Sequence, residues 1–398
     1  MKSLEIFSGA GGLAKGLEIA GFDHAAFIEF NKHACDSLKL NFAQDKVFFG
    51  DVRDYDFLSQ GHVDIVAGGP PCQPFSMGGK HQADLDDRDM FPHAIRAIEI
   101  LKPKAFVFEN VKGLLRDSFA DYFQYILHCL TYPEHKTNTA SNWKERLQAL
   151  RSIRFASFSG VKYRVSYQLL NAADFGVPQC RERVVIVGIR DDIEGEWKFP
   201  AATHSEQRLM WEKFVTGEYW ERHKVPKRQR EIANAAAVDK ASRLKEMYGM
   251  FAPEHLPWQT VRDALFDVPD PSSKHNIAGH IFRDGARIYP GHNGSCYDSP
   301  AKTIKAGGHG VPGGENMIRF QDGLVRYFTV FEAKRIQTFP DDFVITGGWG
   351  EAMRQIGNAV PVLLAEKLGH ALVKCLQQEK IKPLRDAVRQ NESVLMTA

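Results

Sequence analysis

The feature that most constrains the fold is an alternation, through the first half of the chain, of short apolar runs with segments of helical spacing. The apolar runs are too short for helices and are typical of buried strands. Strands separated by helices predict parallel β–α–β units in an α/β fold whose sheet is covered on both faces. The expected strands are Leu4–Phe7, Ala25–Glu29, Val47–Phe49, Asp64–Ala67, Ala105–Phe108 and Val184–Ile189, and the expected helices are Leu13–Ala20, Lys32–Asn41 and Phe91–Leu101.

One polar stretch interrupts this alternation. Thr131–Gly160 contains a single short predicted helix at Trp143–Arg151. A surface insertion and a packing element would both have this composition, and the sequence leaves the two alternatives open.

The alternation ends near Asp191, and no regular pattern follows as far as about Gly323. This stretch has a predicted helix at Glu231–Met247, and its basic run is Lys224, Lys227, Arg228 and Arg230. Helical spacing returns at Thr329–Gln337 and Val362–Cys375. We therefore expect a small loop-rich domain, 191–323, inserted into a larger domain made of 1–190 and 324–398.

Composition narrows the class of protein. Of 398 residues, 43% are hydrophobic and 25% charged, which is an ordinary globular balance. A membrane span of about 18 apolar residues is absent from the sequence, as is the apolar core of a signal peptide. The six cysteines form no CxxC pair and the histidines show no ligand spacing, so we expect free thiols, no metal site and a cytoplasmic location. The formal net charge of +2 decides nothing about nucleic-acid binding.

A glycine-rich turn follows the first predicted strand, with the sequence Phe7-Ser8-Gly9-Ala10-Gly11-Gly12. Glycines there allow a tight turn and a close approach of the backbone to a ligand, but the spacing is not that of a pyrophosphate site. Glu29 ends the second predicted strand and Asp51 follows the third. Carboxylates at such strand ends suit a ribose diol and an exocyclic amine. Each is alone more often a solvated turn residue, whereas the ordered set predicts a nucleoside cofactor.

A proline-rich loop, Gly69–Ser76, follows another buried strand and has Cys72 in its middle. The prolines make the loop rigid and would present the thiol at the edge of the sheet where α/β folds bind ligands. Most free cysteines are small buried hydrophobes, but packing does not require a cysteine between prolines. We therefore predict that Cys72 is a nucleophile whose pKa is lowered by nearby cations.

Charged residues flank two further strands. Glu109 ends the strand after the Cys72 loop, and it would project over the same crevice if the two strands are neighbours, which makes it a candidate acid. Arg181 and Arg183 lie two apart, so an extended chain places them on one face, where they need anions or carbonyls as partners. The alternative for the arginines is an edge-strand salt bridge with Glu182.

Taken in order, these segments resemble the cytosine-5 DNA methyltransferase family. The matching segments are Phe7–Gly12, Glu29, Asp51, Gly69–Ser76, Glu109–Val111, Leu170–Pro178, Gln179–Arg183, Ile336–Asp342 and Gln355–Val360. The resemblance implies a Rossmann-like S-adenosylmethionine-dependent methyltransferase fold. It also implies transfer of a methyl group to carbon 5 of a flipped-out cytosine in a specific duplex DNA sequence. Residues 191–323 would be the target recognition domain and would read bases in the major groove.

The resemblance also implies roles for individual residues. Cys72 would attack carbon 6 of cytosine, Glu109 would contact N3 and the exocyclic amine, Arg183 would contact O2, and Arg181 would support the loop and phosphates. The cofactor pocket would comprise Phe7, Ser8, Gly9, Gly11, Gly12, Glu29, Asp51, Val52, Pro70, Asn358 and Val360. The residues expected at DNA are Ser76, Gly79 and Lys80 in a mobile loop, together with Lys227, Arg228 and Thr303. A solvated surface is an equal alternative for the basic run.

The sequence departs from the family at Phe331, where arginine is usual, and this puts a local salt bridge in doubt. Because the match begins near Met1, we expect a bacterial modification enzyme without added regulatory domains, monomeric and paired in function with a restriction endonuclease. Three alternatives stay open: an RNA methyltransferase of the same chemistry, a DNA-binding regulator without activity, and a nicotinamide-dependent oxidoreductase. The intact Cys72, Glu109 and Arg183 argue against the second, and the glycine spacing against the third.

Overall fold

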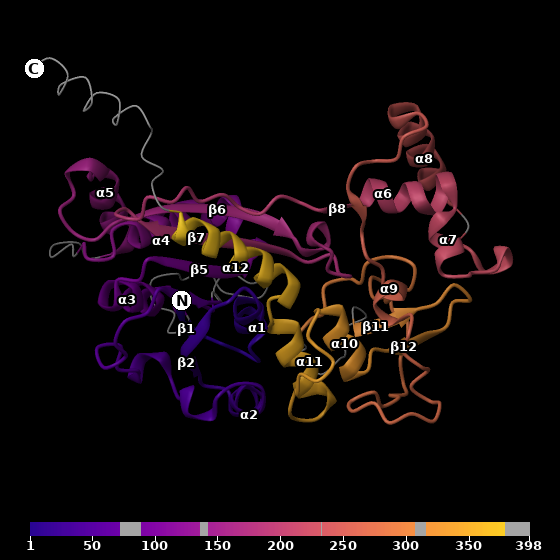
Figure 1. The fold of residues 1–398 in the computed structure, drawn as a ribbon, viewed down its shortest axis with the longest axis horizontal. Coiled ribbons are helices and arrows are strands. Elements are labelled where there is room, and N and C mark those ends of the chain that lie inside the picture. Colours follow the sequence, from indigo (N-terminus) through magenta and orange to yellow (C-terminus); the bar gives the residue numbers. More distant parts are fainter. Residues whose placement is uncertain (72–88, 136–141, 232, 307–315, 379–398) are drawn as a thin grey trace, which may run out of the picture.

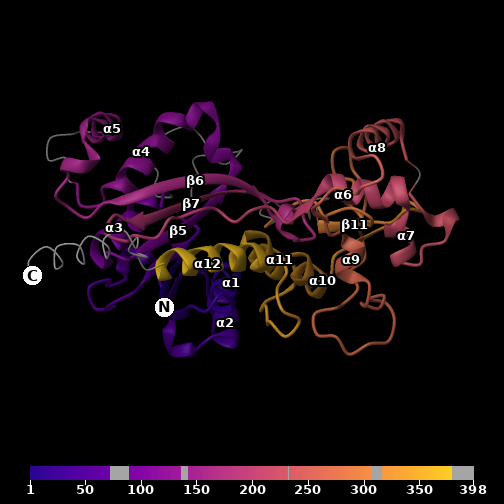
Figure 2. The ribbon, with the colours of Figure 1, turned by 45° about the horizontal axis from the view of Figure 1, so that its top comes forward.

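The predicted strands assemble into one sheet in the computed structural model, which describes residues 1–71, 89–135, 142–231, 233–306 and 316–378. The sheet has seven strands in the order β3-β2-β1-β4-β5-β7-β6. Their bounds are β1 (Lys2–Ile6), β2 (Asp23–Glu29), β3 (Val47–Phe49), β4 (Ile65–Gly68), β5 (Ala105–Val111), β6 (Tyr163–Asn171) and β7 (Glu182–Arg190). Figures 1 and 2 show this sheet on one side of the molecule and a second, loop-rich lobe on the other.

Strand direction differs from the prediction at one end of the sheet. β1 to β5 are parallel as expected, but β7 runs antiparallel to both β5 and β6, so the expectation of parallel units throughout was wrong. The edge strand β6 was also not predicted. Several of its side chains are exposed or half-buried, so it lacks the continuous apolar run that marks the central strands.

Helices cover both faces of the sheet. Their bounds are α1 (Gly12–Ile19), α2 (Lys32–Asn41), α3 (Phe91–Leu101), α4 (Ala120–Thr131), α5 (Trp143–Ser152) and α12 (Val362–Gln377). The prediction of α2 and α3 was correct to the residue, and that of α1 to within one. α1 and α12 share one apolar cluster with β5 and β7, whereas α3 and α4 belong to the cluster on the other face. No helix in the described ranges is long and apolar enough to cross a bilayer.

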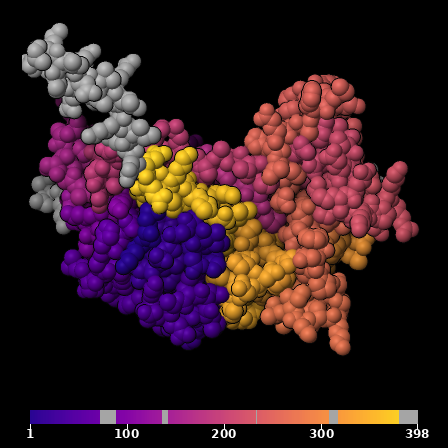
Figure 3. Space-filling view, in the orientation of Figure 1, coloured from indigo at the N-terminus to yellow at the C-terminus, as the bar shows by residue number. Residues whose placement is uncertain are grey.

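The contact between α1 and α12 brings together segments far apart in the sequence. A Cβ on Gly16 would lie 2.4 Å from the Cβ of Ala365, and one on Gly369 would lie 2.6 Å from the Cβ of Ala20. Only glycine permits such an approach of the two helices. The C-terminal helix is therefore part of the wall of the N-terminal sheet, and Figure 3 shows α12 and α11 (Trp349–Asn358) as a yellow band beside the indigo N-terminal residues.

The polar stretch 131–160 has a packing role in its helix. Leu147 and Leu150 on α5 are buried, and the Trp143 ring meets Tyr122 of α4 edge-on with centroids 5.2 Å apart. α5 thus adds an apolar layer to α4. The part of this stretch at 136–141 lies outside the described residues.

The second lobe, defined here as residues 204–327, consists of short elements. They are β8 (His204–Ser205), α6 (Glu206–Trp211), α7 (Glu218–Arg222), α8 (Ala235–Tyr248), β9 (Leu256–Pro257), α9 (Val261–Leu265), β10 (Ser295–Cys296), β11 (Met317–Arg319) and β12 (Val325–Tyr327). α8 begins later than predicted because Asn234 caps it, accepting a hydrogen bond from Ala237 N at 2.9 Å. An apolar cluster joins α9 and β11 to α10 (Val330–Ile336) and α11.

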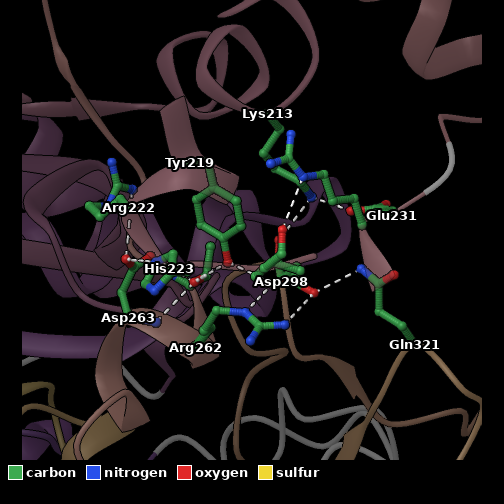
Figure 4. Close-up of polar contacts among 12 residues, drawn as sticks. Lys213, Tyr219, Arg222, His223, Glu231, Arg262, Asp263, Asp298 and Gln321 are labelled. Atoms are coloured by element: carbon green, nitrogen blue, oxygen red, sulfur yellow. Dashed lines mark hydrogen bonds and ion pairs between the residues drawn. The ribbon is translucent and has the colours of Figure 1, made fainter. Parts of the chain in front are cut away.

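A buried polar network around Asp298 holds the second lobe together (Figure 4). The fully buried Asp298 carboxylate accepts hydrogen bonds from Tyr219 Oη at 2.8 Å, Arg262 Nε at 2.6 Å and Gln321 Nε2 at 2.9 Å. Its carbonyl oxygen accepts a bond from Lys213 Nζ at 2.9 Å. Burial alone would raise the pKa of Asp298, but hydrogen bonding and charge from Arg262 outweigh it and lower the pKa. Asp298 thereby links chain segments that are distant in the sequence.

Candidate active site

The candidate site lies at the edge of the sheet where the parallel strands end. The register pairs Ile6 with both Ile28 and Gly68, and Gly68 with Phe108, so the segments that follow these strands meet at one edge. β4 and β5 are neighbours, which was the condition for placing Glu109 over the same crevice as the loop after β4, and Glu109 lies near the end of β5.

The first turn leaves one glycine open to the surroundings. Gly9 and Gly11 have φ values of 53° and 87°, and a Cβ on Gly9 would meet no atom within 4 Å. A Cβ on Gly11 would instead collide with Phe42, and one on Gly12 would lie 2.4 Å from the Val360 carbonyl oxygen. Glycine at 11 and 12 therefore serves packing, whereas Gly9 presents bare backbone. Phe7 has φ 53°, a strained conformation that non-glycine residues rarely adopt.

Glu29 supports this turn from the end of β2. Its Oε2 accepts a hydrogen bond from Gly9 N and its Oε1 one from Asn31 N, both at 2.8 Å. Ser8 N donates to Ile28 O at 3.2 Å. Burial raises the pKa of Glu29, against the opposing effect of these backbone bonds. A carboxylate oxygen accepts more than one hydrogen bond, so both oxygens keep capacity for a ligand.

Asp51 lies after β3 and has a basic neighbour. Its carboxylate accepts bonds from Arg53 N at 2.8 Å and from Arg53 Nη2 at 2.7 Å, and this side-chain bond is the main cause of its lowered pKa. The adjacent Val52 is buried, and its carbonyl oxygen accepts a bond from Arg96 Nη2 at 2.7 Å. Asp51 and Val52 are thus held in place after β3, at the same edge of the sheet as the glycine-rich first turn.

Asn110 holds the start of the proline-rich loop by a side-chain hydrogen bond. Its Nδ2 donates to Pro70 O at 2.9 Å, and its Oδ1 accepts a bond from Val111 N at 2.9 Å. Met90 N donates to Pro71 O at 3.2 Å. The loop therefore leaves the sheet at Pro71 and returns beside it at Met90. The predicted residues Cys72, Ser76, Gly79 and Lys80 lie outside the described residues.

Glu109 forms a buried ion pair with Arg183. Glu109 Oε1 and Arg183 Nε lie 2.6 Å apart, and both side chains are nearly buried. Within the described residues this contact is an ion pair and Oε1 accepts no hydrogen bond. Arg183 pairs across the sheet with Val111, which places it diagonal to Glu109. Gly69 lies beside this carboxylate, since a Cβ there would be in ordinary contact with Glu109 Oε2 at 3.5 Å.

Arg181 is 1% exposed and has incomplete hydrogen bonding. Its Nη2 donates to Gly357 O at 3.0 Å, whereas Nε and Nη1 have no partner within the described parts of the chain. Burial, followed by the nearby charge of Arg183, lowers the pKa of Arg181 to about 9, so it remains a cation at neutral pH. Buried guanidinium N–H groups require acceptors, which a phosphate or carbonyl would supply.

The C-terminal segment closes the edge. Asn358 ends α11 and is exposed, and the buried Val360 places its carbonyl oxygen against Gly12. Sequence reasoning missed Gln179 as an individual residue and missed Gln337, although both are fully buried. No local signal marks them, because their partners come from distant segments.

The departure at Phe331 does not remove a salt bridge from this region. Phe331 is buried, and its ring meets His280 at 5.8 Å between centroids. The neighbouring Glu332 pairs with Arg326 instead, at 2.6 Å and 2.7 Å. The ion pair is therefore present, with its arginine on β12.

The residues predicted to contact DNA fall in two settings. Lys227 and Arg228 are exposed on a short 3₁₀ turn of the second lobe, as either a DNA contact or a solvated surface would require. Thr303 is half-buried and its Oγ1 donates to Cys180 O at 2.9 Å. Thr303 thus joins the second lobe to the segment that precedes β7.

Comparison with known proteins gives consistent matches over nearly the whole chain. The family model for C-5 cytosine-specific DNA methylases matches residues 1–133 and 143–374. Type II methyltransferase M.NgoMIV from Neisseria gonorrhoeae is 31% identical over 382 residues, covering 95% of this chain and 98% of that protein. Type II methyltransferase M.Sau96I from Staphylococcus aureus is 30% identical, covering 94% and 76%. The solved structure of S. pombe Dnmt2 methyltransferase has a TM-score of 0.57 and 18% identity, covering 95% and 100%, which shows likeness of fold.

Proposed function

The chain belongs to the C-5 cytosine-specific DNA methylase family, and from this premise we infer how its residues share the reaction. It is a DNA (cytosine-5-)-methyltransferase, which methylates carbon 5 of cytosine in DNA. Its fold is that of the S-adenosylmethionine-dependent methyltransferases, and membership implies S-adenosylmethionine as the methyl donor. The roles of individual residues, the division into domains and the biological partner are proposals.

The residues at the first turn fit such a donor. Gly9 offers open backbone, and Glu29 keeps acceptor capacity for the ribose hydroxyls. Asp51 and Val52 would receive the adenine, and Phe7 would stack on it. The proposed pocket consists of Phe7, Ser8, Gly9, Gly11, Gly12, Glu29, Asp51, Val52, Pro70, Asn358 and Val360. When bound, the donor supplies an electrophilic methyl group on its sulfonium.

The buried pair of Glu109 and Arg183 carries the assignment of the target base. Carbon 5 of cytosine is a poor nucleophile until a thiolate adds to carbon 6, and Cys72 would supply that thiolate. Glu109 would stabilise the charge that develops at N3. Its Oε1, which accepts no hydrogen bond from the described residues, would also have acceptor capacity for the exocyclic amine. Arg183 would hold O2, and Arg181 would direct its free N–H groups to the Cys72 loop or to phosphate. A base then removes the carbon 5 proton, and the thiol is eliminated.

We propose that the substrate is a specific duplex sequence, read by residues 191–323. The target base lies inside the stack, so the enzyme must flip it out at a cost of roughly a few kcal/mol. Lys227 and Arg228 would contact phosphates, and Thr303 would take part in contacting the DNA. Ser76, Gly79 and Lys80 would contact it from the loop expected to close over the DNA. The relatives are Type II methyltransferases, and by analogy the enzyme would act as a monomer that protects host DNA from a partner restriction endonuclease.

The first test is incubation with S-adenosylmethionine and random-sequence duplex DNA in which 5-fluorocytosine replaces cytosine. Fluorine takes the place of the hydrogen on carbon 5, and a base cannot remove it. The thiol is then not eliminated, so the wild-type protein should form a DNA adduct that survives denaturation. Cys72→Ala should form none. An undiminished adduct in this variant would exclude Cys72 as the nucleophile. A parallel incubation uses methyl-labelled S-adenosylmethionine with duplex DNA or with transfer RNA. Transfer of the label to transfer RNA but not to DNA would show that the substrate is RNA.

A second test addresses the proposed domain. Replacing residues 191–323 with the corresponding region of M.NgoMIV should move the methylated sequence while leaving cytosine carbon 5 as the acceptor. Sequencing of 5-methylcytosine positions on plasmid DNA measures both. An unchanged target sequence would contradict the domain assignment.

A further inference from the structure

Two fully buried glutamines join the second lobe to the turn that precedes α12. Gln179 Oε1 accepts a hydrogen bond from Ile304 N at 3.0 Å, and its Nε2 donates to Gln337 Oε1 at 3.1 Å. Gln337 Nε2 then donates to Ile356 O at 2.6 Å and to Ala359 O at 3.1 Å. One continuous series of side-chain hydrogen bonds therefore runs from residue 304 to residue 359.

The first end of this series is attached to the second lobe. Ala301 N donates to Pro178 O and Cys180 N donates to Ala301 O, both at 2.8 Å. Asp298, the centre of the polar network in Figure 4, lies three residues before Ala301. A displacement of the second lobe around Asp298 would thus be transmitted to the backbone that holds Gln179.

The other end lies between Arg181 and the first turn. Gly357 O accepts the only described hydrogen bond of the Arg181 side chain. Val360 O packs against Gly12, where it excludes any side chain. The turn at 356–360 therefore contacts Arg181 on one side and the glycine-rich first turn on the other. Its position depends on the side-chain amide of Gln337, which donates to its carbonyl groups.

Gln337 is suited to fix this turn because its hydrogen bonds leave it little choice of orientation. Both of its N–H groups are used by carbonyl oxygens, and its own oxygen is used by Gln179. If Ile304 moved away and Gln179 reoriented, Gln337 could not follow without taking from the Ala359 carbonyl oxygen its one described donor, whereas Ile356 O would keep the bond from Ala359 N at 3.2 Å. The network therefore favours one joint arrangement of lobe and turn.

We propose that Gln337 is a positioning residue that couples DNA binding by the second lobe to methyl-donor binding at the 356–360 turn. This inference rests on the proposed placement of the donor beside Asn358 and Val360. Coupling of this kind is reciprocal, because DNA must tighten donor binding by the same factor as the donor tightens DNA binding.

The test compares Gln337→Met with wild type. Sequencing of 5-methylcytosine on plasmid DNA first identifies the target, and a duplex of that sequence is then synthesised. Isothermal titration gives the Kd of S-adenosylhomocysteine without and with this duplex. We expect the duplex to tighten binding by at least about 5-fold in wild type, the lower end of typical coupling, and by under about 2-fold in Gln337→Met. Gln179→Met should behave alike, and the double variant should lose no more than either single variant.

The matched control is Gln355→Met. Gln355 is a buried glutamine on α11 whose bonds run to Ser37 at 2.7 Å and Thr346 O at 2.8 Å, away from the Gln179 series. This variant should lower Tm as Gln337→Met does but keep the coupling factor. Equal coupling in wild type and Gln337→Met, no coupling in wild type, or its loss in the control would each overturn the inference.

Two further outcomes are distinguishable. If wild type does not bind S-adenosylhomocysteine at all, the proposed function fails together with the inference. If wild type binds and shows coupling that Gln337→Met preserves, only the inference fails. Should Gln337→Met not fold, Gln337→Asn retains the amide on a shorter side chain, and coupling at the wild-type level in that variant would also overturn the inference.

Discussion

The sheet and the second lobe are stabilised in different ways. The central strands β1, β4 and β5 pack between two layers of helices mainly through apolar side chains, although Ser3 and Glu5 of β1 and Glu109 and Asn110 of β5 are also buried. The second lobe has short elements and places ionisable groups in its interior, among them Asp298, Lys213 and Glu212. Apolar burial is non-directional and tolerates many arrangements, whereas a buried carboxylate requires each donor in its place. The sheet region therefore depends mainly on packing, whereas the second lobe depends on specific polar partners.

The largest expected effect is on chemistry in the sheet region. Glu109→Gln removes both the proposed acid and the charge that faces Arg183, so kcat should fall about 10²- to 10⁴-fold, and loss of the buried ion pair should also lower Tm. Single-turnover methylation of duplex DNA measures the rate. Glu134→Gln is the control, because Glu134 pairs with Lys102 away from the site and should leave kcat unchanged. A decrease of only a few-fold in Glu109→Gln would contradict the assigned role.

The next effect tests the polar network. Asp298→Ala leaves Arg262, Tyr219 and Gln321 without their buried carboxylate acceptor, so the free energy of unfolding should fall by about 3–5 kcal/mol. DNA binding should be lost, whereas S-adenosylhomocysteine binding without DNA should persist. Asp239→Asn is the control, since its exposed pair with Arg243 contributes little. Loss of S-adenosylhomocysteine binding in Asp298→Ala would show that the two regions do not differ in the way described.

A third change tests packing in the sheet region. Gly16→Ala improves helix propensity but places a methyl group 2.4 Å from the Ala365 Cβ, so overpacking should cost about 1–3 kcal/mol. Thermal unfolding should show a lower Tm. Gly350→Ala on α11 is the matched control, because a Cβ there meets no atom within 4 Å, and it should raise Tm slightly. An unchanged or higher Tm in Gly16→Ala would refute the close approach of α1 and α12.

The smallest effect is a pH dependence confined to the polar network. The folded pKa of Asp298 is lowered, so its stabilisation is fully present above its unfolded pKa of about 3.9 and is lost as pH falls through the lower folded value. The difference in Tm between wild type and Asp298→Asn should be constant from about pH 7 to 5 and narrow below about pH 4. A difference that widens on acidification would mean that the pKa of Asp298 is raised.

The same contrast explains how much could be predicted from sequence. α2 and α3 have local apolar periodicity and recognisable starts, Asn31 as the N-cap of α2 and Pro92 in the first turn of α3, so their predicted bounds agree with the structure. α11 was not predicted, because Gly350 and Gly357 lower its helix propensity although the helix packs well. The antiparallel direction of β7 depends on connections through unpredicted segments, which periodicity does not report.

The site shows a similar division. The segments around Gly9, Glu29 and Glu109 could be placed at one sheet edge because each follows a recognisable strand. The partners Gln179 and Gln337 could not be paired, since they are separated by 158 positions and no periodicity connects them. The network around Asp298 could not be predicted for the same reason. Its members are polar and charged residues of types usual at protein surfaces, and only the three-dimensional structure shows that they are buried.

The packing of α12 on α1 has a consequence for the newly made protein. The glycine face of α1 emerges from the ribosome early, but the helix that covers it is made 346 residues later, from residue 16 to residue 362. At a translation rate of about 5–20 residues per second, that face lacks its covering helix for roughly 20–70 s. The turn at 356–360 arrives equally late. A chain whose synthesis stops early therefore lacks the turn proposed to close the donor pocket, so partial translation products should not methylate DNA.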